Sequence, residues 1–264
     1  LAGSSVKFIA TATIGFDHID TDYCDANGIR WTNAPGCNSK SVEQYIASTI
    51  MVLAEKNGWN LSEKCIGVVG VGNVGSKVAR VAEIFGMKVL LNDPPRERAE
   101  GVDKFVSLET VMNEADIITL HVPLNMKGED ATFHLADTNF FAALKRNPVL
   151  INSCRGEVTQ TEAVKNALKA GSISDFVCDC WENEPDIDLE LLALTEIATP
   201  HIAGYSKDGK ATGTEMSVHA ISQYFGLGLE NWQPSGVEQP TNPVFELDGT
   251  GLSEQEIIAK AILH

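Results

Sequence analysis

The sequence has 264 residues, with 20 lysine and arginine side chains against 36 aspartate and glutamate side chains, and its formal net charge is −16. Proteins that bind nucleic acid present a basic surface, so this charge argues against that class. Hydrophobic residues make up 44% and charged residues 21%, which excludes a disordered or fibrous protein, and the length suits one large or two ordinary domains.

The apolar segments are too short for a membrane span, and the cysteines form no metal pattern. The run from Cys65 to Val71 has the length of a strand, whereas a spanning helix needs about 20 residues. The six cysteines show no CxxC spacing and no histidine at zinc-ligand spacing. We therefore expect reduced, buried thiols in a cytoplasmic protein that has no metal site. The chain opens at Leu1 rather than Met, and we expect processing or truncation.

Short apolar runs alternate with amphipathic stretches along the chain. Runs of this length that are rich in Val, Ile and Leu are typical of strands buried on both faces, which indicates a parallel sheet under helices. The predicted strands are Val6–Ala10, Cys65–Gly70, Lys88–Leu91, Asp116–His121, Val149–Ser153, Phe176–Asp179 and Glu196–Thr199.

Helix signals fill the intervals between these strands. Ser41 with Gln44, and Thr159 with Glu162, have the spacing of capping boxes that open helices. The predicted helices span about 41–57, 73–86, 159–171, 204–226 and 253–264. Alternating strand and helix over about 62–200 predicts an α/β fold, a doubly wound parallel sheet of the Rossmann type.

The flanks differ from this central part. Residues 1–35 hold one or two βα units. Residues 231–243 are a linker rich in Pro, Gly and polar side chains, and an apolar, strand-like patch separates it from the last predicted helix.

A glycine motif stands directly after the strand that begins at Cys65. Gly70 permits a tight turn, Gly72 lets the backbone approach a pyrophosphate, and Gly75 lets the following helix pack close to the strand. Asp93 lies at the end of the next strand, 18 residues beyond Gly75. The strand, the helix and the acid together predict a dinucleotide site; the alternative is a glycine turn in an unrelated βα unit.

Asp93 also bears on which dinucleotide binds. Its carboxylate can accept hydrogen bonds from ribose hydroxyls and would repel a 2′-phosphate, so NAD is favoured over NADP. Arg96 and Arg98 follow closely and offer the alternative of a phosphate contact, although solvated surface arginines are more common.

A second group of polar residues follows three other predicted strands. Arg155, Glu184 and His201 each stand where a strand's carboxyl end meets a loop, the edge at which open α/β sheets bind ligands. Arg155 can hold a carboxylate or carbonyl, His201 can remove a hydroxyl proton, and Glu184 can orient the imidazole. Taken singly, an isolated histidine is more often structural, and Glu184 lies in an acidic stretch.

The sequence resembles the NAD-dependent D-2-hydroxyacid dehydrogenases. The resemblance rests on VGVGNVG, on INSCRG, on Glu184 before Pro185 and on TPHIAGY, and it places Arg155, Glu184 and His201 at the family's catalytic Arg, Glu and His. It implies hydride transfer from a 2-hydroxy acid to NAD. Strings such as PGCN and DPPR narrow the resemblance to a branch with a phosphorylated substrate.

The resemblance implies further contacts, position by position. Those expected at NAD are Gly70, Gly72, Asn73, Val74, Gly75, Asp93, Val122, Ser153, Cys154, Asp179 and Gly204, and those expected at substrate are Thr13, Arg155 and Tyr205. Val122 stands where the family commonly has Thr, so only a backbone contact is expected there. Structural alternatives are a turn for Thr13, a strand-end cap for Asp179 and helix packing for Tyr205.

The resemblance also predicts the domain organisation. The predicted domains are 1–38, the remainder of a flavodoxin-like substrate domain; 39–201, the NAD-binding domain; 202–230, a helix returning to the substrate domain; and 231–264, the start of an α+β dimerisation domain. We expect a homodimer that has no nucleic-acid or membrane partner. Other branches of the family, acting on 3-phosphoglycerate or on glycerate and hydroxypyruvate, and a non-catalytic NADH-sensing protein remain alternatives.

Overall fold

The computed structural model describes residues 1–101, 103–238 and 240–263. They divide into two compact units. Unit 1 comprises Leu1–Ser41 and Gly204–Glu246, and unit 2 comprises Val42–Ala203 and the segment from Leu247 onward. Within the described residues, no helix combines the length and the apolar composition that crossing a membrane requires.

Unit 2 is built on a six-stranded sheet in which every pairing is parallel. Its strands are β3 (Cys65–Val69), β4 (Lys88–Asn92), β5 (Ile117–Leu120), β6 (Val149–Asn152), β7 (Asp175–Cys178) and β8 (Ile197–Ala198). The spatial order is β4-β3-β5-β6-β7-β8. Every residue of β3, β5 and β6 is buried, as expected for strands covered on both faces. The predicted parallel sheet is therefore confirmed, with each predicted strand within two residues of its observed ends.

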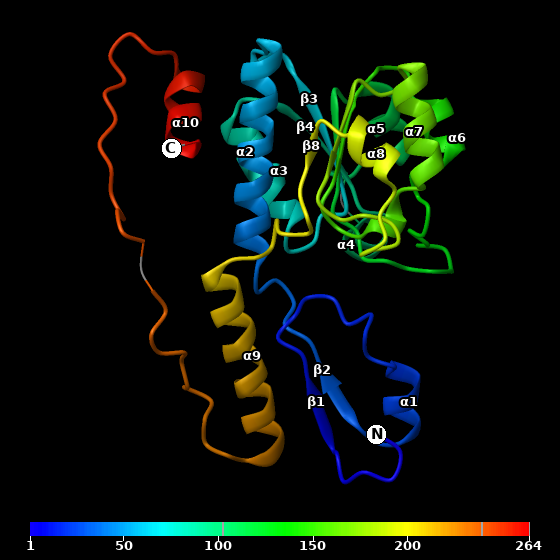
Figure 1. Ribbon diagram of the computed structural model, residues 1–264, viewed down its shortest axis with the longest axis vertical. Coiled ribbons are helices and arrows are strands. Elements are labelled where there is room, and N and C mark those ends of the chain that lie inside the picture. Colours follow the sequence, from blue (N-terminus) through cyan, green and yellow to red (C-terminus); the bar gives the residue numbers. More distant parts are fainter. Residues whose placement is uncertain (102, 239, 264) are drawn as a thin grey trace. The chain divides into compact units, whose positions relative to one another are not determined.

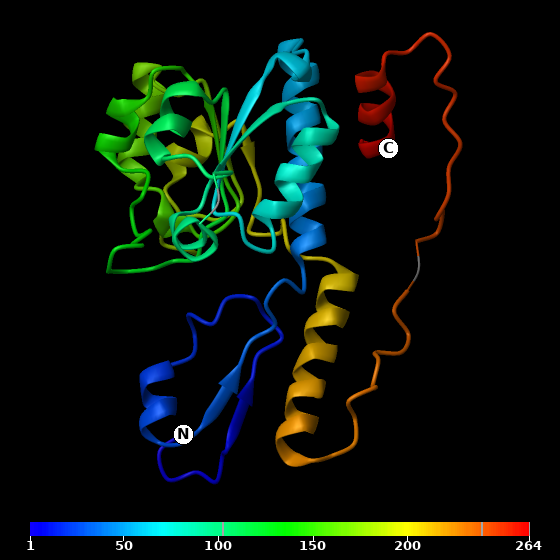
Figure 2. The ribbon, with the colours of Figure 1, turned by 180° about the vertical axis from the view of Figure 1, so that it is seen from behind.

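Helices cover both faces of this sheet (Figures 1 and 2). One face carries α2 (Ser39–Asn57) and α3 (Gly75–Ile84), and the other carries α5 (Leu108–Glu114), α6 (Thr138–Ala143), α7 (Thr161–Ala170) and α8 (Leu189–Leu194). The short helix α4 (Pro94–Glu100) follows β4, and 3-10 turns η1 (Leu61–Glu63) and η2 (Gly156–Val158) precede β3 and α7. Each face has its own apolar core, and strand residues such as Ile66 and Leu150 contribute to one or the other.

Both predicted capping boxes are wrong. Helix α2 begins at Ser39, so Ser41 lies in its first turn, and the Ser41 hydroxyl bonds to Ser206 Oγ at 2.5 Å. Helix α7 begins after Gln160, which makes no side-chain cap. The Thr159 hydroxyl donates to Gly156 O at 3.1 Å, because it sits close to that carbonyl in the preceding 3-10 turn. The Thr159 hydroxyl therefore bonds to the Gly156 carbonyl instead of capping α7.

The C-terminal helix α10 (Glu254–Ile262) packs against the α2 face of unit 2. A capping box of Ser253 and Glu256 opens it. The Gln255 amide then bonds to two backbone groups near η1: its Oε1 accepts from Leu61 N at 2.9 Å, and its Nε2 donates to Trp59 O at 2.8 Å. The apolar patch predicted to be strand-like before this helix forms no strand.

Unit 1 contains a two-stranded parallel sheet of β1 (Phe8–Ala10) and β2 (Arg30–Thr32), with α1 (Thr21–Ala26) and the long α9 (Lys207–Phe225). Phe8 contacts the ring of Tyr224 at 4.8 Å between centroids. Gly213 lets α9 approach the chain closely, because a Cβ there would lie 2.5 Å from Ala12 O.

Replacement of Gly67 by alanine tests how tightly α5 packs on the sheet. A Cβ at Gly67 would lie 2.3 Å from Val111 Cγ1, so we expect Gly67→Ala to lower the free energy of unfolding by about 1–3 kcal/mol. The matched control is Gly72→Ala, where a Cβ would meet nothing within 4 Å. Urea unfolding should show the loss only for Gly67→Ala. Equal stability of the two variants would contradict tight packing at Gly67.

Candidate active site

The turn after β3 has the geometry that the glycine motif predicts. Gly70 has φ +86°, and a Cβ there would lie 2.6 Å from His121 O. A Cβ at Gly75 would lie 1.9 Å from Gly70 O, so the start of α3 contacts the turn directly. Around Gly72, by contrast, there is open space. No side chain caps α3 at Val74, which leaves the start of the helix available to an anion.

This turn lies at the switch point of the sheet. Strand β3 pairs with β4 on one side and with β5 on the other, so the chain reverses its direction of progress across the sheet there. Ligands of open α/β sheets bind outside the carboxyl ends of the strands at such a point. The residues that follow β4, β6 and β7 reach the same edge.

Asp93 links the end of β4 to the glycine turn. Its Oδ2 accepts a hydrogen bond from Val71 N at 2.8 Å, and its Oδ1 caps α4 by accepting from Arg96 N at 3.1 Å. Each carboxylate oxygen keeps capacity for a further donor such as a ribose hydroxyl.

The two arginines near Asp93 are both paired. Arg96 donates to Val71 O and to Glu100 Oε1, each at 2.5 Å. Hydrogen bonds from Arg96 and Lys104 lower the pKa of Glu100 to about 2, so Glu100 is charged at neutral pH. Arg98 bonds to Asp130 at 2.5 Å. Each guanidinium group that was the alternative ligand for a 2′-phosphate is therefore paired with a carboxylate.

The segment after β6 carries Arg155 and holds it through Asn152. Asn152 Nδ2 donates to Arg155 O at 2.9 Å, and Asn152 Oδ1 accepts from Cys154 N at 3.2 Å. Arg155 Nη1 donates to Cys154 O at 2.6 Å. Burial raises the pKa of Cys154 to about 11, so it stays a thiol and is not a nucleophile.

The predicted partners Glu184 and His201 are in contact. His201 Nδ1 lies 2.8 Å from Glu184 Oε2, and Glu184 Oε1 accepts from Trp181 N at 2.7 Å. The side chains of His201 and Glu184 are 47% and 35% exposed, so the imidazole can reach a ligand.

Asp179 holds the loop on which His201 lies. This carboxylate is 1% exposed, and it accepts hydrogen bonds from Thr199 Oγ1 at 2.6 Å, from Ile202 N at 2.8 Å and from Ala203 N at 2.9 Å. His201 N donates to the Asp179 carbonyl at 2.8 Å. These contacts are those of a cap at the end of a strand, which was the structural alternative for Asp179.

Tyr45 and Trp181 support the same loop, and neither was among the predicted site residues. Tyr45 Oη lies 2.8 Å from Thr199 Oγ1, and Trp181 Nε1 donates to Thr199 O at 2.8 Å. Burial raises the pKa of Tyr45 to about 12, so its hydroxyl keeps the proton that it donates. Their sequence positions carry no motif that would have identified them.

The remaining predicted residues differ in their surroundings. Val122 packs against the glycine turn, because its Cγ1 would lie 2.9 Å from a Cβ on Gly70. Ser153 Oγ is buried and has no hydrogen-bond partner among the residues that the structure describes. An unpaired donor of this kind, the open space at Gly72 and the uncapped α3 fit a polar, anionic dinucleotide.

Thr13, Gly204 and Tyr205 belong to unit 1, and their expected ligand contacts stay predictions. The Thr13 hydroxyl donates to Gly15 O at 2.7 Å, as a turn residue does. Tyr205 is 70% exposed, and Lys210 Nζ lies 3.4 Å from the centre of its ring.

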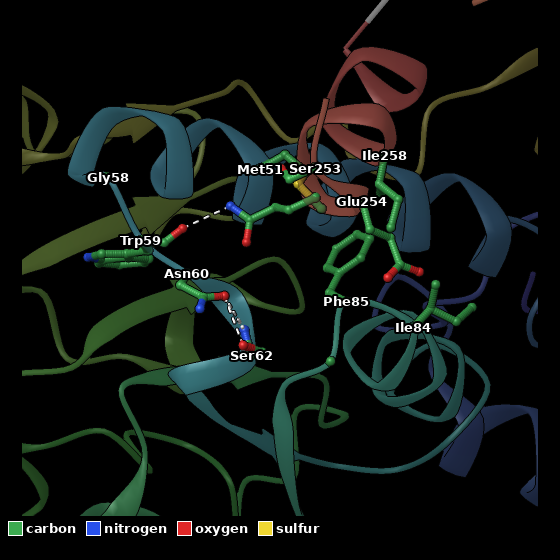
Figure 3. Close-up of a pocket in the computed structure, with 12 residues that line it drawn as sticks. Met51, Gly58, Trp59, Asn60, Ser62, Ile84, Phe85, Ser253, Glu254 and Ile258 are labelled. Carbon is green, nitrogen blue, oxygen red and sulfur yellow. Dashed lines mark hydrogen bonds between the residues drawn. The ribbon is translucent and has the colours of Figure 1, made fainter. Parts of the chain in front are cut away.

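A cavity of about 540 Å³ lies at the opposite, amino-terminal edge of the sheet, where Trp59, Phe85 and Ile258 surround it (Figure 3). None of the predicted site residues lines it. Among the described residues, no group of three or more His, Cys, Asp or Glu side chains is placed to hold a metal ion.

Comparison with known proteins agrees with this geometry. The family model described as "D-isomer specific 2-hydroxyacid dehydrogenase, NAD binding domain" matches residues 39–203. The erythronate-4-phosphate dehydrogenase of Bacteroides thetaiotaomicron is 59% identical over 248 residues, covering 93% of this chain and 70% of the relative. That of Porphyromonas gingivalis is 46% identical over 265 residues, covering 100% and 71%.

Solved structures show the same fold. The D-lactate dehydrogenase of Aquifex aeolicus, complexed with NAD and lactic acid, has a TM-score of 0.71 at 30% identity, covering 86% of this chain and 78% of that one. The chain spans about two thirds of the length of the erythronate-4-phosphate dehydrogenases it matches, 65% in the case of a Bacteroides fragilis relative. The chain belongs to the D-isomer specific 2-hydroxyacid dehydrogenase family, and its residues 39–203 match the NAD-binding domain of that family.

Proposed function

We propose that this protein uses NAD to oxidise 4-phospho-D-erythronate to 2-oxo-3-hydroxy-4-phosphobutanoate, a step in the synthesis of pyridoxal 5′-phosphate (vitamin B6). The names of its 59% and 46% identical relatives support this substrate. The observation that carries the chemistry is the 2.8 Å contact between His201 and Glu184 at the carboxyl edge of an NAD-binding sheet.

The partner of His201 determines which ring nitrogen can act as a base. Glu184 is a carboxylate that accepts hydrogen bonds, so His201 Nδ1 carries the proton toward it. Nε2 then keeps its lone pair and can accept the proton of the substrate 2-hydroxyl. The imidazolium formed in this step is stabilised by the negative charge of Glu184.

Arg155 is the group that would bind the carboxylate end of the substrate. A guanidinium holds a carboxylate through two parallel hydrogen bonds, which fixes its orientation. The bond from Arg155 Nη1 to Cys154 O and the bond from Asn152 to Arg155 O hold this side chain and its backbone. We propose that Thr13 and Tyr205 also contact the substrate.

The residues around the glycine turn would hold the cofactor. Gly70, Gly72, Asn73, Val74 and Gly75 would contact the pyrophosphate, and Asp93 the ribose. Bound NAD supplies the acceptor for the hydride that leaves C2. We propose that Ser153, Cys154 and Asp179 line the nicotinamide side, and that Gly204 and the backbone of Val122 also contact the cofactor.

We also propose that the protein acts in the cytoplasm as a homodimer. All six cysteines are free thiols, which suits a reducing compartment. Light scattering on the purified protein measures its oligomeric state, and a monomeric mass would contradict the dimer.

A comparison of substrates tests the proposed reaction. We expect kcat/KM for NAD reduction to be at least about 100-fold higher with 4-phospho-D-erythronate than with 3-phosphoglycerate or glycerate, because the second is one carbon shorter between its carboxylate and its phosphate and the third lacks the phosphate. A preference for 3-phosphoglycerate or glycerate would assign the protein to another branch of the family. NADH binding without turnover of any 2-hydroxy acid would favour a sensor.

Replacement of the base and of the carboxylate ligand tests the assigned roles. We expect His201→Asn and Arg155→Ala each to lower kcat/KM by about 100-fold or more, with the Kd of NAD within about twofold of wild type. His219→Asn is the matched control, because the His219 ring bonds to Trp232 O on unit 1 and has no role in the proposed step. Near-normal turnover by His201→Asn would contradict the mechanism.

A further inference from the structure

Two histidine–glutamate pairs meet at the tripeptide 182–184. Glu184 bonds to His201, and Glu182, two residues earlier, lies 2.6 Å through its Oε1 from His134 Nε2. His134, Asn183 and His201 have φ values of +51°, +64° and +55°, a backbone region that residues with a Cβ rarely adopt. The surrounding contacts must therefore hold this backbone in place. The proposed reaction uses only the pair at Glu184.

Both carboxylate oxygens of Glu182 are occupied. Its Oε2 accepts a hydrogen bond from Thr161 N, at the start of α7, at 2.9 Å. Burial raises the pKa of Glu182, but the hydrogen bonds from Thr161 and His134 together lower it by more than burial raises it. The pKa of Glu182 is therefore below its usual value. Glu182 is therefore ionised at neutral pH, and at 14% side-chain exposure its bonds are shielded from water.

The backbone around His134 pairs with the segment that follows Arg155. His134 N donates to Glu157 O at 2.8 Å, and Ala136 exchanges two hydrogen bonds with residues 158 and 160, at 3.0 and 3.1 Å. The ring of His134 also stacks on Phe133, with 4.0 Å between centroids. His134 is thus held by the segment that carries Arg155, and its side chain reaches to Glu182.

The two loops also touch directly through their backbones. A Cβ on Gly156 would lie 2.0 Å from the carbonyl carbon of Trp181 and 2.3 Å from Glu182 N. Gly156 follows Arg155, and the Trp181 amide donates to Glu184 Oε1. A shift of the chain at Glu182 would therefore move both neighbours.

We propose that His134 and Glu182 are positioning residues that hold the loops of Arg155 and Glu184 in a fixed relation. Their hydrogen bond joins the segment after Arg155 to the tripeptide that ends in Glu184. Loss of the bond frees the tripeptide at Asn183 and weakens the orientation of His201 by Glu184. The roles given to Arg155 and Glu184 rest on the proposed function, whereas the mechanical link between the loops does not.

Amide exchange at Trp181 tests the link without any substrate. The Trp181 amide is protected in wild type by its bond to Glu184 Oε1. In the full chain with His134→Ala, we expect its exchange rate to rise by about tenfold or more. Glu196→Gln is the matched control, because Glu196 pairs with Lys56 at 2.6 Å and lies just before β8, at the other edge of the sheet.

The distribution of the exchange rates decides the outcome. Faster exchange at Trp181 in His134→Ala and in Glu182→Gln, with the control unchanged, supports the proposal. Faster exchange at Thr161 alone would show that Glu182 merely caps α7, and it would overturn the proposal. An unchanged rate at Trp181 would overturn it as well.

Kinetics then test whether the link matters for catalysis. We expect His134→Ala and Glu182→Gln each to lower kcat by about tenfold with the Kd of NAD unchanged, and the double variant to be no slower than the slower single one. His134→Gln, whose amide can still donate to Glu182, should recover most of kcat. Additive losses, or wild-type kcat in both single variants, would overturn the proposal. A wild-type protein that does not turn over 4-phospho-D-erythronate would contradict the proposed function instead, and the exchange rates would still decide the link.

Discussion

The buried carboxylate of Asp179 determines where His201 lies. A charge this far from water is stable only when its oxygens are hydrogen-bonded, and Thr199, Ile202 and Ala203 supply those bonds. Since His201 lies between these donors and bonds through its own amide to the Asp179 carbonyl, the loop has one favourable arrangement. The contact of His201 with Glu184 follows from that arrangement, and with it the availability of the second ring nitrogen.

The same principle extends along the carboxyl edge of the sheet. Parallel strands bring the ends of β4, β6 and β7 to one edge, but they leave the following loops free. Short polar contacts then fix each loop: Asp93 to the glycine turn, Asn152 to the segment of Arg155, and Glu182 to His134. The backbone hydrogen bonds between neighbouring strands stop where the strands end, and these side-chain contacts stabilise the loops beyond that point. Polar side chains are therefore concentrated at this edge. An edge built in this way offers an anion local groups, such as the uncapped start of α3, although the whole chain carries a charge of −16.

Apolar runs and the glycine spacing were sufficient to predict the parallel sheet and the turn at Gly70, and they indicate the edge that carries the candidate site. Apolar runs and glycine spacing involve residues that are close together in the sequence, so a sequence pattern can reveal them. The capping box at Ser41 failed because α2 begins two residues earlier, and the one at Thr159 failed because the Thr159 hydroxyl bonds to the Gly156 carbonyl in a turn that composition does not show. The pairing of Arg96 with Glu100 is an i,i+4 contact within the short helix α4, which was not among the predicted helices. The link from His134 to Glu182 depends on the folded geometry of loops and joins residues 48 positions apart. Residue types alone therefore indicated the candidate site but not the contacts that hold its loops.

The structure of the Asp179→Asn variant tests most directly whether a buried carboxylate places His201. The amide keeps the shape of the side chain, but its NH₂ group cannot accept from the backbone amides of the loop. In a crystal structure of the variant, we expect the backbone at 199–203 to be displaced and His201 Nδ1 to lie beyond hydrogen-bonding distance of Glu184 Oε2. An unchanged loop, with that contact still near 2.8 Å, would contradict this expectation.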